Sequence, residues 1–533
     1  MKLVEAAKPI AGDNLAKETT VPVTRSQAIA RAPRRLWPVL IPLGVFVVHA
    51  LLFGPWIIDD AAISYVYARN LAAGHGFIAQ LGDALVEGYS NFTWVMLLTP
   101  FFALHFFDPV ITAKLLSVGL IALTFGMIYH AFGYRRSVLV ALVLAALNTS
   151  FVMWGVSGLE NPLNAFFAAL LLLAALKDRP ALAGLAAALL AMTRPDGLAY
   201  ALVFPALIVI GAVSRRGLRA YLLAFSVPFA LFLGFRYATF GAWLPNTASA
   251  KGTITLDEVL KLIPLGLSYG GIFGLVLLAA LPLVAGLAFL RRQLDRPMMI
   301  VLVFVACGLA IFVLLPLDWM REFRFATNAT LFLHLCLALL VERIAGPRVG
   351  RVLALIVLLL AVPFYAARSI SLATAPDISF QLVLAGSDAI SAYAHVAGLP
   401  NNASLLAADA GGILYDARLH LIDLAGLIDP VIARTLPDPD GERDAFHEYI
   451  FEVTQPDLIL IHGFWVYRAA LYNDPRFHEA YQPVVVCDDA YMWNTHSVRL
   501  PAGLWVRADA AARTVPDDVL NRLWGLIGCA PEP

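Results

Sequence analysis

Residues 112–131, TAKLLSVGLIALTFGMIYHA, form the apolar run that decides the fold. About 20 apolar residues are needed to cross the hydrocarbon core of a bilayer as a helix. This run has that length, with one charge, Lys114, near its start. Arg135 and Arg136 follow it, and basic residues gather on the cytoplasmic side of membrane proteins. The run therefore predicts a membrane-spanning helix that ends on the cytoplasmic side.

Similar apolar runs lie on both sides of this one. The run at 92–107 is short and contains Pro100. If it lies on the outer membrane surface, Arg135 and Arg136 are inside, and every later span has its basic loop inside as well. We therefore predict a polytopic α-helical membrane protein with about eleven transmembrane helices. The predicted spans are 37–54, 112–131, 137–153, 160–177, 181–193, 196–213, 219–240, 266–290, 298–316, 327–343 and 352–367.

The composition agrees with this class. The chain is 60% hydrophobic and 14% charged, whereas soluble domains average about 45–50% apolar and about 25% charged residues. The formal net charge is zero, so bulk electrostatics gives no support for a nucleic-acid partner. Residues 1–36 are polar and end in basic residues, which predicts a disordered cytoplasmic tail.

Residues 368–533 differ from the rest, because their apolar stretches are short and separated by turn residues. Stretches 404–408, 420–424 and 458–462 read as strands, and 444–453 reads as a helix between strands. We predict an α/β domain, which an odd number of spans places on the outer face. Gly411 and Gly412 lack the G-x-G-x-x-G spacing, so no nucleotide cofactor is expected.

The predicted organisation has three parts. Of the four cysteines, Cys487 and Cys529 could form a disulfide if the C-terminal part is outside the cytoplasm. The parts are a cytoplasmic tail (1–36), a membrane module (37–367, with outer loops 55–111, 154–160, 241–265 and 317–326) and an extracytoplasmic α/β domain (368–533).

Unusual polar residues gather in the predicted outer loops. Asp59 and Asp60 follow the first span directly, and charged groups at membrane depth suggest function. They could also cap a helix running to about Ala73. In the later loops Glu160 could be a helix cap or a first-turn dipole partner, and Arg194 could pair with Asp196. Lys251 could snorkel to the surface, and Arg321 could pair with Glu322.

Carboxylates and cations on one membrane face fit the transfer of a sugar from a lipid phosphate. A carboxylate can take the proton of the acceptor hydroxyl, and cations or a metal can stabilise the leaving phosphate. Asp59, Asp60 and Glu160 could supply oxygen ligands to Mg²⁺, Ca²⁺ or Mn²⁺, although no spacing demands it.

The order of motifs resembles the GT-C superfamily of glycosyltransferases, which use polyprenyl-phosphate sugars, and more narrowly the mycobacterial terminal arabinofuranosyltransferases. The matching stretches are DDAAISY (59–65), YARN (67–70), GHG (74–76), VEGYSN (86–91), GLE (158–160), TRPDG (193–197), LPNT (244–247) with Lys251, DWM (318–320) with Arg324 and Phe325, and IDLAGLIDP (422–430).

This resemblance implies a bacterial plasma-membrane enzyme that moves a sugar, with arabinofuranose suggested, to a cell-envelope glycan or glycolipid. It places catalysis at the acidic pair of the first loop. We assign catalysis to Asp59 and Asp60, donor phosphate or sugar binding to Arg69, Arg194, Arg236, Asn246, Lys251, Asp318 and Arg324, and acceptor or other contacts to Glu87, Tyr89, Asn91, Glu160 and His75.

Two other functions stay open. A transporter or flippase of lipid-linked sugars predicts ionisable residues in mid-span, and the long runs contain few. A non-catalytic membrane protein could bind glycan through its C-terminal domain, where Asp409, Asp423, Asp429 and His462 lie near predicted strand ends.

Overall fold

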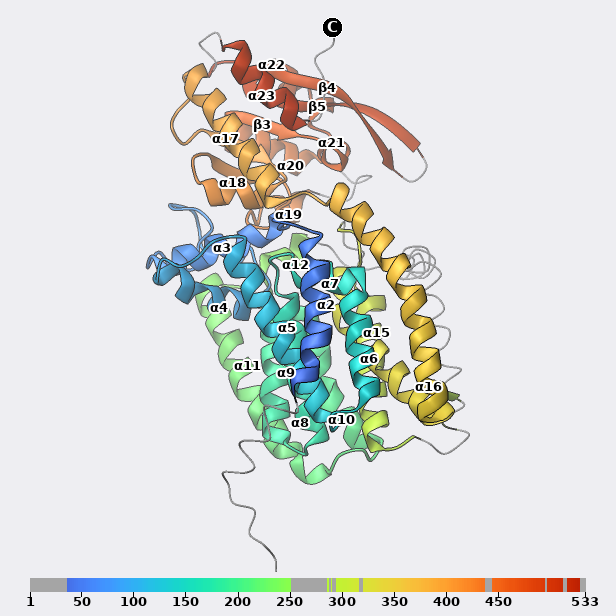
Figure 1. Ribbon diagram of the computed structural model, residues 1–533. Helices are drawn as coiled ribbons and strands as arrows, with labels where there is room; N and C mark the ends of the chain where they lie inside the picture. Colours follow the sequence, from blue (N-terminus) through green and yellow to red (C-terminus); the bar gives the residue numbers. More distant parts are fainter. Residues whose placement is uncertain are drawn as a thin grey trace, which may run out of the picture.

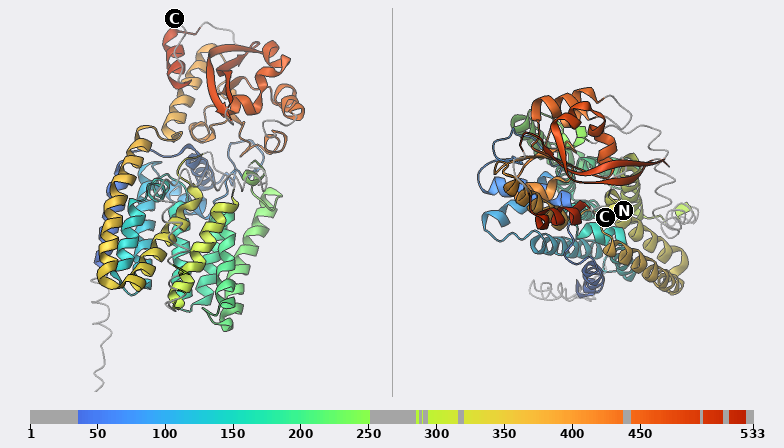
Figure 2. Two further views of the ribbon diagram at one scale, coloured as in Figure 1. Left: turned by 90° about the vertical axis from the view of Figure 1, so that its right-hand side faces the viewer. Right: turned by 90° about the horizontal axis from the view of Figure 1, so that it is seen from above.

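A helical bundle carries a mixed α/β layer at one end (Figures 1 and 2). The computed structural model describes residues 36–250, 285–286, 289, 294–315, 320–436, 443–493, 496–510 and 515–527. The bundle contains α2 (Leu40–Leu51), α5 (Ile111–Ala131), α6 (Arg136–Leu147), α7 (Thr149–Gly155), α8 (Asn161–Leu176), α9 (Pro180–Thr193), α10 (Val203–Val209), α11 (Leu218–Phe240), α15 (Arg296–Leu314) and α16 (Thr327–Thr374).

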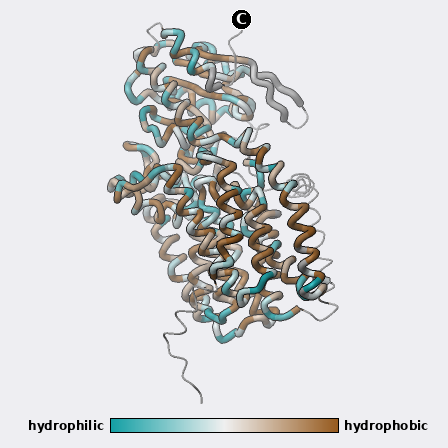
Figure 3. Tube along the Cα trace, in the orientation of Figure 1, coloured by the Kyte–Doolittle hydropathy of each residue, from teal (hydrophilic) through white to brown (hydrophobic). Residues whose placement is uncertain are grey.

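Within the described residues, four helical stretches are long and apolar enough to cross a membrane, or five if one bent pair counts as a single span. Hydrophobic residues dominate the bundle helices (Figure 3). Together with shorter apolar helices they mark a multi-pass membrane protein. The four are Ile111–Ala131, Arg215–Phe240, Arg324–Gly346 and Arg348–Thr374; the shorter ones are Trp37–Leu51, Phe92–Ala103, Asn161–Leu176, Pro180–Thr193, Pro195–Val209 and Arg296–Phe312.

The helices coincide with the predicted spans, apart from 266–290, which lies outside the described residues except at 285–286 and 289. Two spans are less regular than predicted. The one at 137–153 bends by 72° between α6 and α7, at Asn148, whose side chain accepts a hydrogen bond from Phe151 N. The one at 196–213 begins as a 3-10 helix, η2 (Pro195–Leu202). Gly346, with φ +72°, separates the two arms of α16, as the predicted spans 327–343 and 352–367 require.

The segment between α2 and α5, which we call the first loop, holds two helices. The first is α3 (Asp59–Ala72), which agrees with the helix predicted to run to about Ala73. The second is α4 (Phe92–Ala103), which lies within the run 92–107, where a surface helix was predicted. Figure 1 shows α3 between the bundle and the α/β layer, with α4 beside it. That α4 lies on the membrane surface stays a prediction.

The α/β layer, which we call the C-terminal domain, is built on a five-stranded sheet of order β2-β1-β3-β5-β4. Strand β1 pairs in parallel with β2 and β3, whereas β3–β5 and β5–β4 are antiparallel. The three predicted strands and the predicted helix are confirmed. The elements are α17 (Phe380–Ala397), β1 (Ser404–Ala407), α18 (Ala410–Asp416), β2 (His420–Asp423), α19 (Ile432–Thr435), α20 (Asp444–Glu448), η5 (Tyr449–Thr454), β3 (Leu458–Ile461), α21 (Phe464–Ala469), α22 (Pro475–Ala480), β4 (Tyr481–Trp493), β5 (His496–Arg507) and α23 (Asp517–Ile527).

Backbone bonds join the end of the last span to the first loop. Ile58 forms an isolated antiparallel bridge with Ser379. Asp59 N donates to Ile378 O at 3.2 Å, and Phe380 N donates to Ile57 O at 2.9 Å. The chain therefore enters the C-terminal domain through a segment held against α3.

Two further observations bear on the predictions. Cys487 is disulfide-bonded, while Cys307 and Cys336 are free; Cys529 lies outside the described residues. The predicted pairing of Arg321 with Glu322 is wrong, because Arg321 binds Asp377, with Nε 2.6 Å from Oδ1. Glu322 pairs with Arg368 instead.

Candidate active site

Asp59 lies at the contact between the bundle and the C-terminal domain. It is the first residue of α3, and its side chain is buried. Its Oδ2 accepts from Gly411 N at 2.8 Å and its Oδ1 from Gly412 N at 2.7 Å. Burial raises the pKa of this carboxyl well above its usual value, and the nearby charges of Asp409 and Asp60 raise it further. Asp59 thus caps α18 of another domain, and not its own helix.

Arg69, at the other end of α3, binds the other end of α18. Its guanidinium donates to Tyr415 O at 2.8 Å and to Leu414 O at 3.3 Å, and it lies 5.2 Å from the centre of the Tyr415 ring. A cation at carbonyls that end a helix is a favourable arrangement. The predicted phosphate contact of Arg69 does not fit, because the guanidinium is committed to these carbonyls.

Asp60 is the more exposed member of the acidic pair. Its charge acts on Asp59, as does the charge of Asp409. Asp409 follows β1, and its Oδ2 lies 2.9 Å from Nε2 of His462, which follows β3. The assigned site residues omitted Asp409 and His462, although a polar residue directly after each parallel strand was a usable signal.

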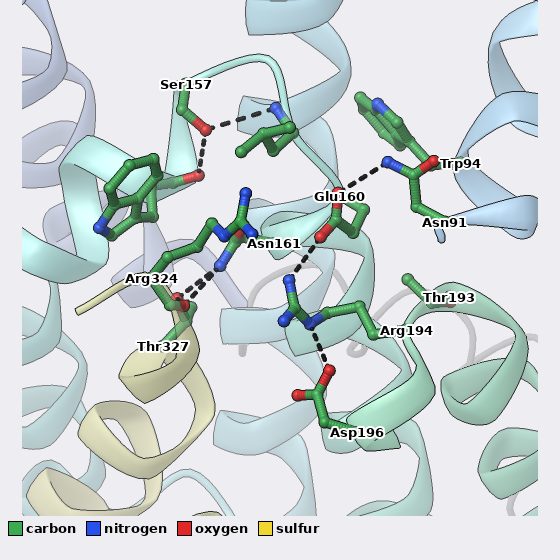
Figure 4. A network of polar contacts seen from close by, with 12 residues as sticks. Asn91, Trp94, Ser157, Glu160, Asn161, Thr193, Arg194, Asp196, Arg324 and Thr327 are labelled. Atoms are coloured by element: carbon green, nitrogen blue, oxygen red, sulfur yellow. Dashed lines mark hydrogen bonds and ion pairs between the residues drawn. The ribbon is translucent and has the colours of Figure 1, made fainter. Parts of the chain in front are cut away.

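A second polar cluster lies near the first (Figure 4), because Ile58 N donates to Ser157 O at 3.0 Å. Its centre is Glu160, which is buried. Glu160 Oε1 lies 2.6 Å from Arg194 Nη1, and Glu160 Oε2 accepts from Asn91 Nδ2 at 2.8 Å. Arg194 Nε also binds Asp196 Oδ1 at 2.9 Å. The predicted Arg194–Asp196 pair is confirmed, and Glu160 makes no side-chain cap to its own helix.

Arg324 completes this cluster from a 3-10 turn (Arg324–Ala326) that comes directly before α16. Its side chain is buried and close enough for its charge to act on Glu160. The guanidinium groups of Arg324 and Arg194 lie 5.1 Å and 4.7 Å from the centre of the Phe325 ring. Asn161 Nδ2 donates to Arg324 O at 2.9 Å. Two cations are thus held beside one shared aromatic ring.

Glu87 and Arg236 form a third, separate buried pair. Arg236 Nε lies 2.7 Å from Glu87 Oε2, and Arg236 Nη2 donates to Oε1 at 3.1 Å. Burial raises the pKa of Glu87, and the charge of Arg236 opposes that rise. The backbone of Asn246 donates to Glu87 O at 3.0 Å. The predicted donor role of Arg236 does not fit, because its charge is neutralised by Glu87.

The remaining predicted residues fall in four groups. Asn246 Nδ2 donates to Gly426 O and Leu427 O at 2.8 and 2.9 Å, so it binds the C-terminal domain. Tyr89 is buried, and its hydroxyl has no hydrogen-bond partner among the described residues. His75 is exposed. Lys251 and Asp318 lie outside the described residues.

The predicted metal ligands do not come together. Within the described parts of the chain, no three His, Cys, Asp or Glu side chains are placed to hold a metal ion. Both oxygens of Asp59 accept from amides, and those of Glu160 accept from Arg194 and Asn91. The trio of Asp59, Asp60 and Glu160 therefore does not fit a metal site.

The C-terminal domain is the part of the chain that matches a known protein family. Residues 381–509 match the model of a domain of unknown function, DUF8728. A search of curated proteins gives no significant match.

Two solved structures match a larger part of the chain than this domain model does. ArnT from Cupriavidus metallidurans in the apo state has a TM-score of 0.54 at 13% identity, covering 91% of this chain and 100% of that one. The apo oligosaccharyltransferase of Archaeoglobus fulgidus has a TM-score of 0.49 at 14% identity, covering 78% and 69%. At such identities the likeness to ArnT shows the fold alone. The predicted fold class, a helical membrane protein with a C-terminal α/β domain, is confirmed.

Proposed function

We propose that this chain, which has the GT-C fold, is a glycosyltransferase that moves a sugar from a polyprenyl-phosphate donor to a cell-envelope glycan or glycolipid. Arabinofuranose is the first sugar to test, because the motif order resembles arabinofuranosyltransferases. One observation carries the proposal. The acidic pair lies against the C-terminal domain, because Asp59 binds the amides of Gly411 and Gly412. It also lies next to the buried cations: Ile58 N donates to Ser157 O at 3.0 Å, and Ser157 lies near Glu160, Arg194 and Arg324 (Figure 4).

The chemistry needs a base for the acceptor. Asp60 is our candidate, because it is the more exposed carboxylate of the pair and both oxygens of Asp59 accept from amides. In the proposed step, Asp60 takes the proton of the acceptor hydroxyl as the oxygen bonds to the anomeric carbon. The bond from that carbon to the phosphate oxygen breaks, and the phosphate leaves with the electron pair.

The leaving phosphate gains charge and needs cations. Arg324 is our candidate, because it is buried and a buried cation acts strongly on a nearby anion. Arg194 already faces two carboxylates, Glu160 and Asp196. Glu160 is therefore a positioning residue that holds the guanidinium in place, and Arg324 is the cation we expect to contact phosphate.

We also propose that the C-terminal domain and the site lie outside the cytoplasm, at the plasma membrane. The predicted inside loops meet at the opposite end of the bundle. There Arg296 Nη2 lies 2.5 Å from Asp178 Oδ1, Arg296 Nε donates to Ala212 O at 2.7 Å, and Arg343 pairs with Asp295. The disulfide at Cys487 supports the same orientation, since disulfides persist in oxidising compartments.

The test is a transfer assay on purified, folded protein. Radiolabelled polyprenyl-phosphate arabinofuranose and mannose are supplied with a membrane glycan extract, with and without chelator. We expect transfer from one donor and a loss of about 100-fold or more in Asp60→Asn, the size of a general-base contribution. Asp388→Asn, an exposed carboxylate of α17 that pairs with Arg418, is the matched control.

Full activity in Asp60→Asn would remove the proposed mechanism. No transfer from any donor would contradict the enzyme itself. Uptake of the labelled lipid into vesicles without any product would favour transport instead.

A further inference from the structure

The carboxyl ends of β1 and β3 form an edge that the proposed reaction has not used. These strands are parallel neighbours in the middle of the sheet. After β1 the chain turns through α18 to β2 on one side, and after β3 it continues to β4 and β5 on the other. Open α/β sheets bind ligands at such a point, in the crevice outside the carboxyl ends of the strands.

A polar pair occupies this edge. Asp409 lies just after β1 and His462 just after β3, and their Oδ2 and Nε2 atoms are 2.9 Å apart. Their side chains are 19% and 35% exposed, so the pair is neither buried in the core nor fully solvated.

The edge faces the first loop of the membrane module. Gly411 and Gly412 follow Asp409 after one residue, Ala410, and their amides bind Asp59. A Cβ on Gly411 would lie 2.0 Å from Asp59 O, so the two backbones are in direct contact. The charge of Asp409 also acts on Asp59. The pair therefore lies next to the segment that carries Asp60.

The backbone turns at Gly463, directly after His462. Gly463 has φ +58° and ψ −139°, a conformation that glycine adopts far more easily than other residues. A Cβ placed on Gly463 would meet no described atom within 4 Å. The chain thus turns sharply away from β3 directly after His462, whose side chain is 35% exposed.

We propose that Asp409 and His462 form a binding subsite for the acceptor glycan, which rests on the proposed glycosyltransferase function. A carboxylate accepts hydrogen bonds from adjacent sugar hydroxyls, and an imidazole can donate to or accept from them. His462 orients the Asp409 carboxylate through the 2.9 Å contact. The subsite holds the acceptor sugar so that its reacting hydroxyl faces Asp60 from the side of the C-terminal domain.

Binding is measured first, on the full-length purified protein. The probes are fluorescent oligosaccharides of arabinofuranose, galactofuranose and mannose. We expect one probe to bind to the wild type, and its affinity to fall by about tenfold or more in each of Asp409→Asn and His462→Gln. Asp409→Asn removes the charged acceptor of the sugar hydroxyls, and His462→Gln removes the imidazole that orients this acceptor. Asp388→Asn and His478→Gln, whose side chains lie elsewhere on the domain, should bind as wild type.

Transfer kinetics give the second readout. Asp409→Asn and His462→Gln should raise the acceptor KM about tenfold while leaving the donor KM unchanged, and Asp60→Asn should lower kcat. Thermal melts identify any variant that fails to fold. If one of the two variants fails to fold, the binding and kinetics of the other one test the subsite. The subsite is overturned if no probe binds wild-type protein, or if both variants bind and react as wild type.

The two proposals fail in different ways. Transfer that needs Asp60 but is indifferent to Asp409 and His462 overturns the subsite and leaves the enzyme. Oligosaccharide binding that needs Asp409 and His462, without transfer from any donor, supports the subsite as a glycan site and overturns the enzyme.

Discussion

Asp59 and Arg69 hold opposite ends of one helix. Both belong to α3; the Asp59 carboxylate accepts from the first amides of α18, and the Arg69 guanidinium donates to its last carbonyls. The signs match the dipole of α18, since anions favour a helix N-terminus and cations a C-terminus. A helix of the membrane module thus fixes both the position and the direction of a helix in the C-terminal domain.

Asp59→Asn should loosen this contact. The asparagine amide keeps one acceptor oxygen and loses the other, so Gly411 N or Gly412 N is left without a partner, at a cost of about 1–3 kcal/mol. We expect faster hydrogen exchange in residues 409–416, measured by mass spectrometry on the full chain. Asp388→Asn is the control, and unchanged exchange in Asp59→Asn would show that this contact does not stabilise α18.

Gly411→Ala should disrupt the same contact by volume. The added Cβ would lie 2.0 Å from the backbone oxygen of Asp59, and overpacking of this kind costs about 1–3 kcal/mol or more. A lower melting temperature in detergent is expected. Gly126→Ala is the matched control, since its Cβ would meet nothing within 4 Å. Equal melting temperatures for both variants would contradict the close approach.

The Glu87–Arg236 pair should behave as a buried ion pair. Removing either partner, as in Glu87→Met or Arg236→Met, leaves an unpaired buried charge and should cost about 3–5 kcal/mol. The double variant should be more stable than either single one, because no lone charge remains. Thermal melts of the three proteins check this. Additive losses in the double variant would mean that the two charges do not interact.

Stability should depend on pH through Asp423. Burial raises the pKa of this carboxyl to about 7, against about 3.9 in an unfolded chain. Between these values the folded state keeps a proton that the unfolded chain releases, so stability falls as pH rises from about 4 to about 7, by about 4 kcal/mol at most, and is flat above. Asp423→Asn imitates the protonated form.

The melting temperature of Asp423→Asn, relative to wild type, should therefore rise between pH 5 and pH 8. Comparing the two proteins at each pH removes the contribution of other titrating groups. A constant difference across this range would show that Asp423 stays ionised in the folded protein.

Thiol titration tests the disulfide. In denatured, unreduced protein we expect Cys307 and Cys336 to react, because they are free, while Cys487 is protected. After reduction all four cysteines should react. Four reactive thiols before reduction, in protein purified from its native membrane, would contradict both the disulfide and the proposed orientation.

Local patterns in the sequence predicted the spans and the first strands well. The run at 112–131 has the length and charge pattern of a span, and β1 to β3 lie within predicted strands. The hairpin β4–β5 was not predicted, since Pro483 and the acidic Asp488 and Asp489 interrupt its apolar pattern. Residue propensity and hydrophobic periodicity depend on residues that are close in the sequence. They therefore predict an element well where residues close in the sequence determine it.

The site was less predictable because its partners are far apart in sequence. The polar residues Asp59, Arg69 and Arg236 were all singled out correctly as unusual. Their partners, which are amides, carbonyls and Glu87, come from other segments, up to 353 residues away. In the sequence, a charged residue near a membrane boundary looks the same whether it binds a ligand or the end of a distant helix. Only the three-dimensional structure distinguishes the ligand-binding role from the structural one.

The bridge between Ile58 and Ser379 has a consequence for how the protein is made. A neighbouring contact shows how far apart in the sequence the two joined segments are. The Trp56 indole donates to Asp377 O, and Asp377 follows Trp56 by 321 residues. At about 5–20 residues per second, the ribosome reaches Asp377 about 16 to 64 s after Trp56. The acidic segment is therefore translated early yet completed only when the last span has been inserted. The Asp59 carboxylate waits longer still, because Gly411 and Gly412, whose amides it binds in the folded protein, are made after the final span.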